Sequence, residues 1–167
     1  KVYGSFAGNE TILTQRTTAV IAANPSVLSG DLKGDDVVTG KGETLVISNN
    51  GENSQNVVLN WDNGLTADNS CLDGFVISGG NALQGRGGGM LNFNSAPVLR
   101  NIIFKGNAAS NAGGGLFVTA SSDATITNVV FEHNIAAQGG GMMDMASTMR
   151  IQNAIFVGNK AREGGGL

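Results

Sequence analysis

The sequence contains few charged, proline and aromatic residues and only one cysteine. Charged residues make up 14% of the 167 residues, aromatic residues 5%, and there are 2 prolines. Because Cys71 is the only cysteine, no disulfide can form within the chain, and we expect Cys71 to be a small strand residue. The net charge is −3 without a basic run, which argues against a nucleic-acid partner. No apolar run approaches the roughly 20 residues of a membrane-spanning helix.

Glycine, in contrast, is abundant, with 26 residues. The glycines have no strict three-residue period, which excludes collagen, and a hydrophobic content of 41% is too high for a disordered chain. This composition is typical of short strands joined by tight turns. The chain starts at Lys1 without an initiator methionine or a signal peptide, so we expect a processed or excised piece of a longer protein.

A repeat of 25 to 27 residues occupies residues 72–167, with units at 72–98, 99–125, 126–150 and 151–167. Each unit starts with an aliphatic residue, has a second apolar residue five positions later, and continues with an asparagine, a glycine triplet and a large apolar residue. In order, these positions are Leu72, Leu99, Ile126 and Ile151; Ile77, Phe104, Phe131 and Phe156; Asn81, Asn107, Asn134 and Asn159; triplets 87–89, 113–115, 139–141 and 164–166; and Met90, Leu116, Met142 and Leu167.

Each unit is interpreted as one coil of a solenoid. Ile126, Val129 and Phe131 are predicted to point inward from two short strands, and Asn128 between them is predicted to form a corner with left-handed backbone angles. The aligned corner residues are Gly74, Asn101, Asn128 and Asn153. The glycine triplet predicts a further bend before a third strand at 116–119. Helices are disfavoured by the triplets and by the lack of a 3.6-residue apolar period.

We therefore predict an all-β parallel β-helix, a solenoid with three short strands per coil, in which Phe104, Phe131 and Phe156 form one interior column. Residues 1–71 are predicted to form irregular N-terminal rungs and residues 72–167 regular rungs of one continuous domain. The chain stops after a glycine triplet with no visible cap. We expect either that it is a fragment or that its end stacks on further rungs or another chain.

The second half resembles the polymorphic outer membrane protein repeat, first described in chlamydiae. Its F-x-x-N element is matched at 104–107, 131–134 and 156–159, and its G-G-A/G-I/L/M element by the glycine triplets and the residue after each. The resemblance implies a right-handed parallel β-helix exported to the bacterial surface, secreted or associated with the outer membrane, with adhesion as the usual role. Residues 2–11 and 29–31 are similar to the first rungs of secreted bacterial β-helix proteins, which implies the same location.

A candidate binding surface follows the glycine triplets. If Met90, Leu116 and Met142 point inward, the alternate residues form two largely apolar outward columns, a pattern typical of interaction sites. These columns are Leu91, Phe117 and Met143, and Phe93, Thr119 and Met145. We expect a protein or glycan ligand there, and the alternative is that a loop or a missing segment covers the face. Asn92 and Asp144 would then point inward and need hydrogen bonds.

Acidic residues suggest a weaker hypothesis. Asp31, Asp35 and Asp36 lie in a glycine-containing loop of the kind that can bind Ca²⁺. The loop lacks the spacing of a known calcium loop, so we favour a solvated turn and predict no metal site. The same interpretation applies to Asp62, Asp68 and Asp73.

No catalytic constellation is evident. Pectate-lyase-like enzymes on this fold use clustered aspartates with an arginine or lysine base, sometimes with Ca²⁺. The charged residues of the regular rungs fall at different positions of the coil: Asp123, Asp144, Arg86, Arg100 and Arg150. His133 is expected to face solvent, and Thr119, Thr125 and Thr127 do not stack into the ladder that ice binding needs. We predict a non-catalytic bacterial adhesin, stalk or interaction surface without a cofactor. The alternative is a fragment of a polysaccharide lyase or glycoside hydrolase.

Overall fold

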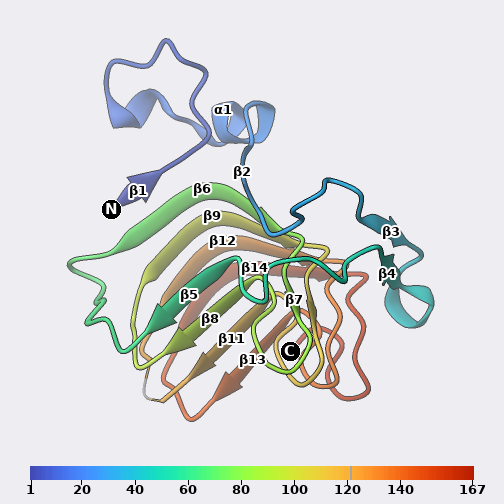
Figure 1. The fold of residues 1–167 in the computed structure, drawn as a ribbon. Helices are drawn as coiled ribbons and strands as arrows, with labels where there is room; N and C mark the ends of the chain where they lie inside the picture. The colour runs from blue at the N-terminus through green and yellow to red at the C-terminus, as the bar shows by residue number, and fades with distance from the viewer. Residues whose placement is uncertain (121) are drawn as a thin grey trace.

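The computed structural model describes residues 1–120 and 122–167 and is a parallel β-helix (Figure 1), which confirms the predicted all-β solenoid. Long strands lie side by side in one parallel sheet, shorter strands form a second, and two-residue strands form a third side. These are β6 (Cys71–Ser78), β9 (Val98–Lys105), β12 (Thr125–Glu132) and β14 (Arg150–Val157); β5 (Val58–Trp61), β8 (Met90–Phe93), β11 (Leu116–Thr119) and β13 (Met142–Met145); and β7 (Asn81–Ala82) and β10 (Ala108–Ala109). No helix among the described residues is long and apolar enough to cross a membrane.

The interior contains the predicted column of aromatic rings. Phe131 pairs with Phe104 on one side and Phe156 on the other, and the ring centroids are 5.0 and 4.8 Å apart. Phe104 and Phe131 are fully buried, as are Leu99 and Ile126. Because each coil hydrogen-bonds to the next in constant register, equivalent side chains pack directly on one another.

The predicted corner forms where the long strands bend. Asn101, Asn128 and Asn153 have positive φ angles of 50°, 54° and 54°, and Gly74 has 79°. The asparagine side chains also form a ladder, in which Asn128 donates to Asn101 at 3.2 Å and Asn153 donates to Asn128 at 3.0 Å. Because the strand continues through this corner, two of the three predicted strands of each coil are one bent strand.

A second, buried asparagine ladder corrects one predicted alignment. Asn107 Nδ2 donates to Asn134 Oδ1, and Asn134 Nδ2 donates to Asn159 Oδ1, both at 3.0 Å. Asn81 was aligned with this column, but its partner in the sheet is Ala108. Gly80 stands opposite Asn107 instead and donates its backbone N–H to the Asn107 side chain. The first regular coil therefore has one additional residue between its inward apolar residue and its asparagine.

The glycine triplets are required by close approach between coils. The first glycine of each has a positive φ, 68° at Gly87 and 64° at Gly113. A Cβ on Gly89 would lie 2.5 Å from the carbonyl oxygen of Gly115 in the next coil, too close for any real side chain. The same crowding occurs at Gly115 and Gly141, which explains why a glycine recurs at the third position wherever another coil follows.

The first coil is interrupted at the corner by residues 4–25. Strands β1 (Val2–Tyr3) and β2 (Ser26–Ser29) both pair with β6, one on each side of its bend. The intervening residues form the 3-10 helix η1 (Leu13–Gln15) and the helix α1 (Thr18–Ala23). Buried Arg16 anchors this insertion, because its guanidinium donates to the backbone oxygen of Gly4 and to the backbone and side-chain oxygens of Asp73, at 2.8 and 3.0 Å.

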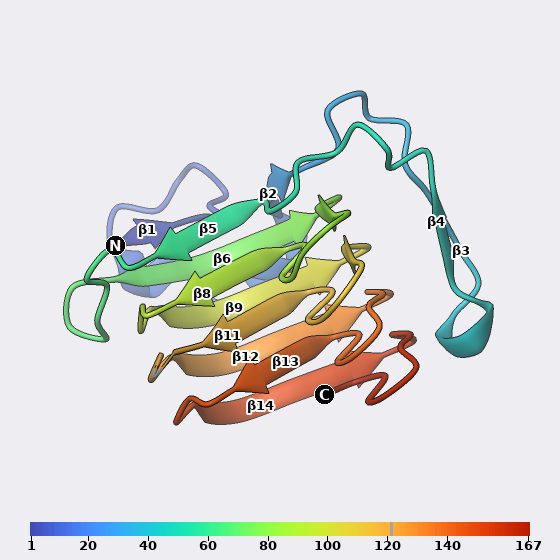
Figure 2. The same cartoon turned by 60° about the horizontal axis from the view of Figure 1, so that its bottom comes forward.

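A second insertion, residues 31–53, forms an arm beside the stacked coils (Figure 2). Its strands β3 (Val37–Thr39) and β4 (Val46–Ser48) pair antiparallel, and η2 (Gly42–Thr44) lies between them. The end of the arm reaches the last described coil. The Gly42 N–H donates to the Gly158 carbonyl at 2.9 Å, and Lys160 Nζ donates to the Leu45 carbonyl at 3.1 Å.

The Phe131→Ala variant tests the aromatic column. We expect it to lower the free energy of unfolding by about 3–5 kcal/mol, because it removes a fully buried ring that contacts two others. Urea denaturation measures the change. Ile155→Ala is the control, since Ile155 is 55% exposed and should cost less than about 1 kcal/mol. Equal costs for the two variants would contradict the column.

Candidate functional site

The candidate site lies on the outer side of the sheet formed by β5, β8, β11 and β13. Met90, Leu116 and Met142 are buried, which confirms the predicted inward phase of these strands. Because side chains alternate along a strand, the intervening residues form two outward columns, each with one residue per coil. By register these are Leu59, Leu91, Phe117 and Met143, and Trp61, Phe93, Thr119 and Met145.

An aromatic platform occupies one end of the second column. The rings of Trp61 and Phe93 are stacked, with centroids 4.3 Å apart and 13° between their planes. Trp61 is 58% exposed and Phe93 is half-buried. Each ring therefore turns one face toward the other, and the second face of Phe93 is turned toward the next coil.

The next coil presents a small side chain to that second face. The sheet partner of Phe93 on β11 is Thr119, and the partner of Thr119 on β13 is Met145. Adjacent strands are about 4.8 Å apart, so Phe93 and Met145 are separated by about two such spacings. Thr119 is too short to fill that interval. Phe93 and Thr119 both line one groove, and its part over Thr119, beside this face of Phe93, is called the slot.

A polar wall borders the columns. Gln84 and Arg86 from one coil and Asn111 from the next line the same groove as the aromatic residues. The guanidinium carbon of Arg86 lies 5.0 Å from the ring centroid of Phe117, a geometry that is attractive because the ring face is electron-rich. Phe117 is only 1% exposed. It therefore forms the buried floor of the groove beneath the arginine, and not part of an open apolar face.

The predicted surface residues are only partly brought together. Leu91, Phe93, Phe117 and Thr119 line the groove with Trp61, Gln84, Gly85, Arg86 and Asn111. Met143 and Met145 continue the two columns on β13, where Met145 is 38% exposed. Asn92 faces inward and accepts a hydrogen bond from Asn60 at 2.6 Å, while Asn92 Nδ2 and Asp144 Oδ1 are buried without a partner.

The repeat pattern does not predict Trp61, which contributes the most exposed ring of the groove. Val58 is the sheet partner of Met90 but precedes it by 32 residues, whereas Met90 and Leu116 are 26 residues apart. The loop between β5 and β6 is longer than the equivalent loops of the later coils, so the repeat cannot be recognised by its spacing at this point. The one signal in the sequence was the strand-like run at 56–59, which Trp61 follows by two residues.

The charged residues considered for catalysis do not line this groove, apart from Arg86. Asp123 and Arg150 line a shallow depression around Thr125 and Met149. Among the described residues the ion pairs are Arg16–Asp73 and Lys105–Glu132. His133 is half-buried in its turn, at a positive φ of 54°. Burial raises the pKa of the Cys71 thiol, with a further contribution from Asp73, and this disfavours the reactive thiolate.

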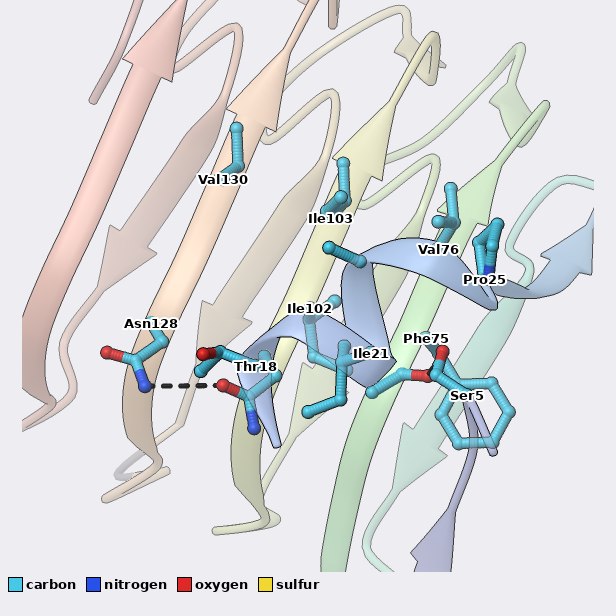
Figure 3. Close-up of a pocket in the computed structure, with 13 residues that line it drawn as sticks. Ser5, Thr18, Ile21, Pro25, Phe75, Val76, Ile102, Ile103, Asn128 and Val130 are labelled. Carbon is cyan, nitrogen blue, oxygen red and sulfur yellow. Dashed lines mark hydrogen bonds between the residues drawn. The ribbon is translucent and has the colours of Figure 1, made fainter. Parts of the chain in front are cut away.

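A second groove lies between α1 and the outer face of β6, β9 and β12 (Figure 3). Ile21 and Ala22 of the helix face Val76, Ile103 and Val130 of the sheet. The polar residues of the lining are Ser5, Thr18, Asn101 and Asn128. Ser5 donates to the Gly74 carbonyl and Asn128 donates to Asn101, so these groups already take part in hydrogen bonds within the protein. Ligand sites generally combine apolar walls with several polar groups that orient the ligand. This groove is better explained as loose packing of the inserted helix on the sheet.

The chain matches no protein-family model, and comparisons with curated proteins and with solved structures find no significant match. The resemblance to the polymorphic outer membrane protein repeat is therefore a hypothesis about ancestry, whereas the β-helix itself is shown by the structure.

Phe117→Asp tests whether this residue supports the groove from within. We expect a loss of at least about 3 kcal/mol in the free energy of unfolding, because the change removes a buried ring and buries a charge. Trp61→Ala is the matched control on the same face. Since Trp61 is mostly exposed, we expect a loss of about 1 kcal/mol or less. A Phe117→Asp variant as stable as the control would contradict the burial of this ring. Urea denaturation compares the two.

Proposed function

We propose that this chain is part of a secreted or cell-surface bacterial β-helix protein that binds a glycan, without catalysis, in the groove along β5, β8 and β11. The observation that carries the proposal is the stacked Trp61–Phe93 pair, whose free face borders a slot with polar walls. Surface location and adhesion are supported by the resemblance of the repeat to polymorphic outer membrane proteins.

A sugar ring has the chemistry that this groove requires. One face of a pyranose carries C–H groups that pack on an aromatic ring, and its rim carries hydroxyls that need hydrogen-bond partners. Phe93 and Trp61 provide the aromatic surface. Gln84 and Asn111 each offer an amide donor and an amide acceptor at the rim. A pyranose placed over Thr119 would extend the aromatic stack by one layer.

Arg86 favours a sugar that carries a carboxylate. It is the only charged residue among the described residues that line the groove, and its guanidinium is already oriented over Phe117. Arginine binds carboxylates through paired hydrogen bonds, and an ordered side chain loses less entropy on binding. We therefore expect uronate-containing or similarly acidic glycans to bind more tightly than neutral ones.

The groove residues support binding and not hydrolysis. Glycoside hydrolysis generally needs two carboxylates on either side of the scissile bond, and the described lining contains no carboxylate and no histidine. No observation in this groove favours the lyase or hydrolase alternative over a binding function.

Binding to an array of neutral and uronate-containing oligosaccharides, followed by titration calorimetry on the best ligand, tests the proposal. We expect Trp61→Ala and Thr119→Phe each to weaken binding at least tenfold, about 1.4 kcal/mol, by removing one of the two aromatic rings of the groove and by filling the slot. Arg86→Gln should weaken the binding of acidic glycans only. Ile155→Ala, on the other sheet, should bind as the parent does.

Three results would contradict the proposal. The first is binding that survives both Trp61→Ala and Thr119→Phe in variants with the parent's circular dichroism spectrum. The second is binding only to aromatic peptides, which would make the slot a protein-docking site. The third is release of reducing ends or unsaturated sugars from the bound glycan, which would identify an enzyme.

A further inference from the structure

The base of the arm brings two distant stretches of the chain together. Gly30 and Ser54 are joined by a hydrogen bond of 2.9 Å from the Ser54 N–H to the Gly30 carbonyl. Both remain part of the stack, since Gly30 donates to Ser78 and Asn81 donates to Ser54, each at 2.8 Å. The outgoing stem that follows Gly30 therefore lies against the returning stem that precedes Ser54.

Carboxylates from both stems converge at this base. One oxygen each from Asp31, Asp35 and Glu52 can be chosen so that all lie within 4.8 Å of one another. Asp36 is not among these three, but its backbone N–H donates to Asp31 Oδ2 at 3.1 Å, which places it beside them. Burial raises its pKa, and repulsion from the carboxylates of Asp31, Glu52 and Asp35 adds to the effect. Among the described residues, no lysine or arginine forms an ion pair with any of these groups.

Several buried oxygens beside these carboxylates lack a hydrogen-bond donor. Asn53 is 9% exposed, and its Nδ2 donates to Asp36 Oδ2 at 2.8 Å, which places the amide against the acidic group. The Oδ1 of Asn53, the Oδ1 of Asp36 and the Oε1 of Glu52 are all buried and unpartnered. Buried polar atoms are almost always paired, so each of these three acceptors needs a partner. A cation meets that need and also neutralises the adjacent carboxylates, which a water molecule does not do.

We propose that the two stems bind a divalent cation, Ca²⁺ by its ligand chemistry, between Asp31, Asp35 and Asp36 on one side and Glu52 and Asn53 on the other. Ca²⁺ takes six to eight oxygen ligands in flexible geometry, from carboxylates and amide carbonyls. All the candidate ligands are oxygens, and no nitrogen or sulfur ligand that would favour a transition metal is among them. The site is independent of the glycan groove.

The cation clamps the arm at its base. Asp31 is already fixed, because its carboxylate accepts backbone N–H groups from the loop that follows, including that of Gly34 at 2.7 Å. Glu52 and Asn53 have no such attachment to the outgoing stem apart from the Asn53–Asp36 hydrogen bond. Binding therefore adds a link between the returning stem and a preformed loop, next to the Ser54–Gly30 hydrogen bond, and strengthens the base of the hairpin that reaches Gly158.

Calorimetric titration of the whole chain with CaCl₂ tests the site, with terbium luminescence as a second probe. We expect one saturable site with a dissociation constant of about 1 mM or tighter, in the range of extracellular calcium modules. Glu52→Gln should weaken it at least tenfold while keeping the shape of the side chain. Asp68→Asn, an exposed carboxylate elsewhere in the chain, is the matched control and should bind as the parent does.

A second measurement follows the arm itself. In the parent, Ca²⁺ should slow tryptic cleavage at Lys41, and EDTA should reverse this protection. In the Glu52→Gln variant, EDTA should not change the rate of cleavage. A parent chain that shows no binding at about 10 mM Ca²⁺ overturns the proposal whether or not the variant folds, because this is well above the range of such sites. Binding that Glu52→Gln leaves unchanged also overturns it.

Discussion

Hydrogen bonding of each coil to the next, in unchanging register, is the constraint on which the rest of this structure depends. It places equivalent positions of the repeat directly above one another. Each side chain must therefore pack on, or hydrogen-bond to, the equivalent side chains of the neighbouring coils. Phe131 packs between Phe104 and Phe156 for this reason, and Asn134 bonds to both Asn107 and Asn159. The same register leaves no room for a Cβ at Gly89, Gly115 and Gly141, the third glycines of the first three triplets.

The two insertions leave the repeat at points where backbone hydrogen bonding between coils continues on both sides. Residues 4–25 leave the first coil at the corner, and β2 resumes pairing with β6 beyond it. Residues 31–53 leave between Gly30 and Ser54, which remain hydrogen-bonded to each other and to the stack. Because the ends of each insertion are held by the coil, its interior is free to take another structure. The arm and its acidic base arise in this way, outside the regular repeat.

The fold could be predicted from the sequence because the columns repeat, and the errors occur where they do not. Asn81 was placed in the wrong column since one additional residue precedes it. The groove could be predicted only in part. Alternation identifies which residues face outward, but the burial of Phe117 depends on where the loop places Arg86, and the loop conformation has no periodic signal. The proximity of Glu52 to Asp31 could not be predicted, because the whole arm separates the two residues in the sequence and the arm has no repeat.

The phenylalanine and the asparagine of the F-x-x-N element show why the repeat predicts the fold better than the outer surface. Both the phenylalanine and the asparagine are turned into the stack, where the register restricts them. The outward columns are under no such restriction. The position of Phe93 is occupied by Thr119 in the next coil. The two strands pair in the same register, but the aromatic stack ends there and the slot begins. The outward residues, one or two per coil, are therefore the positions at which this fold can vary its surface without changing the repeat.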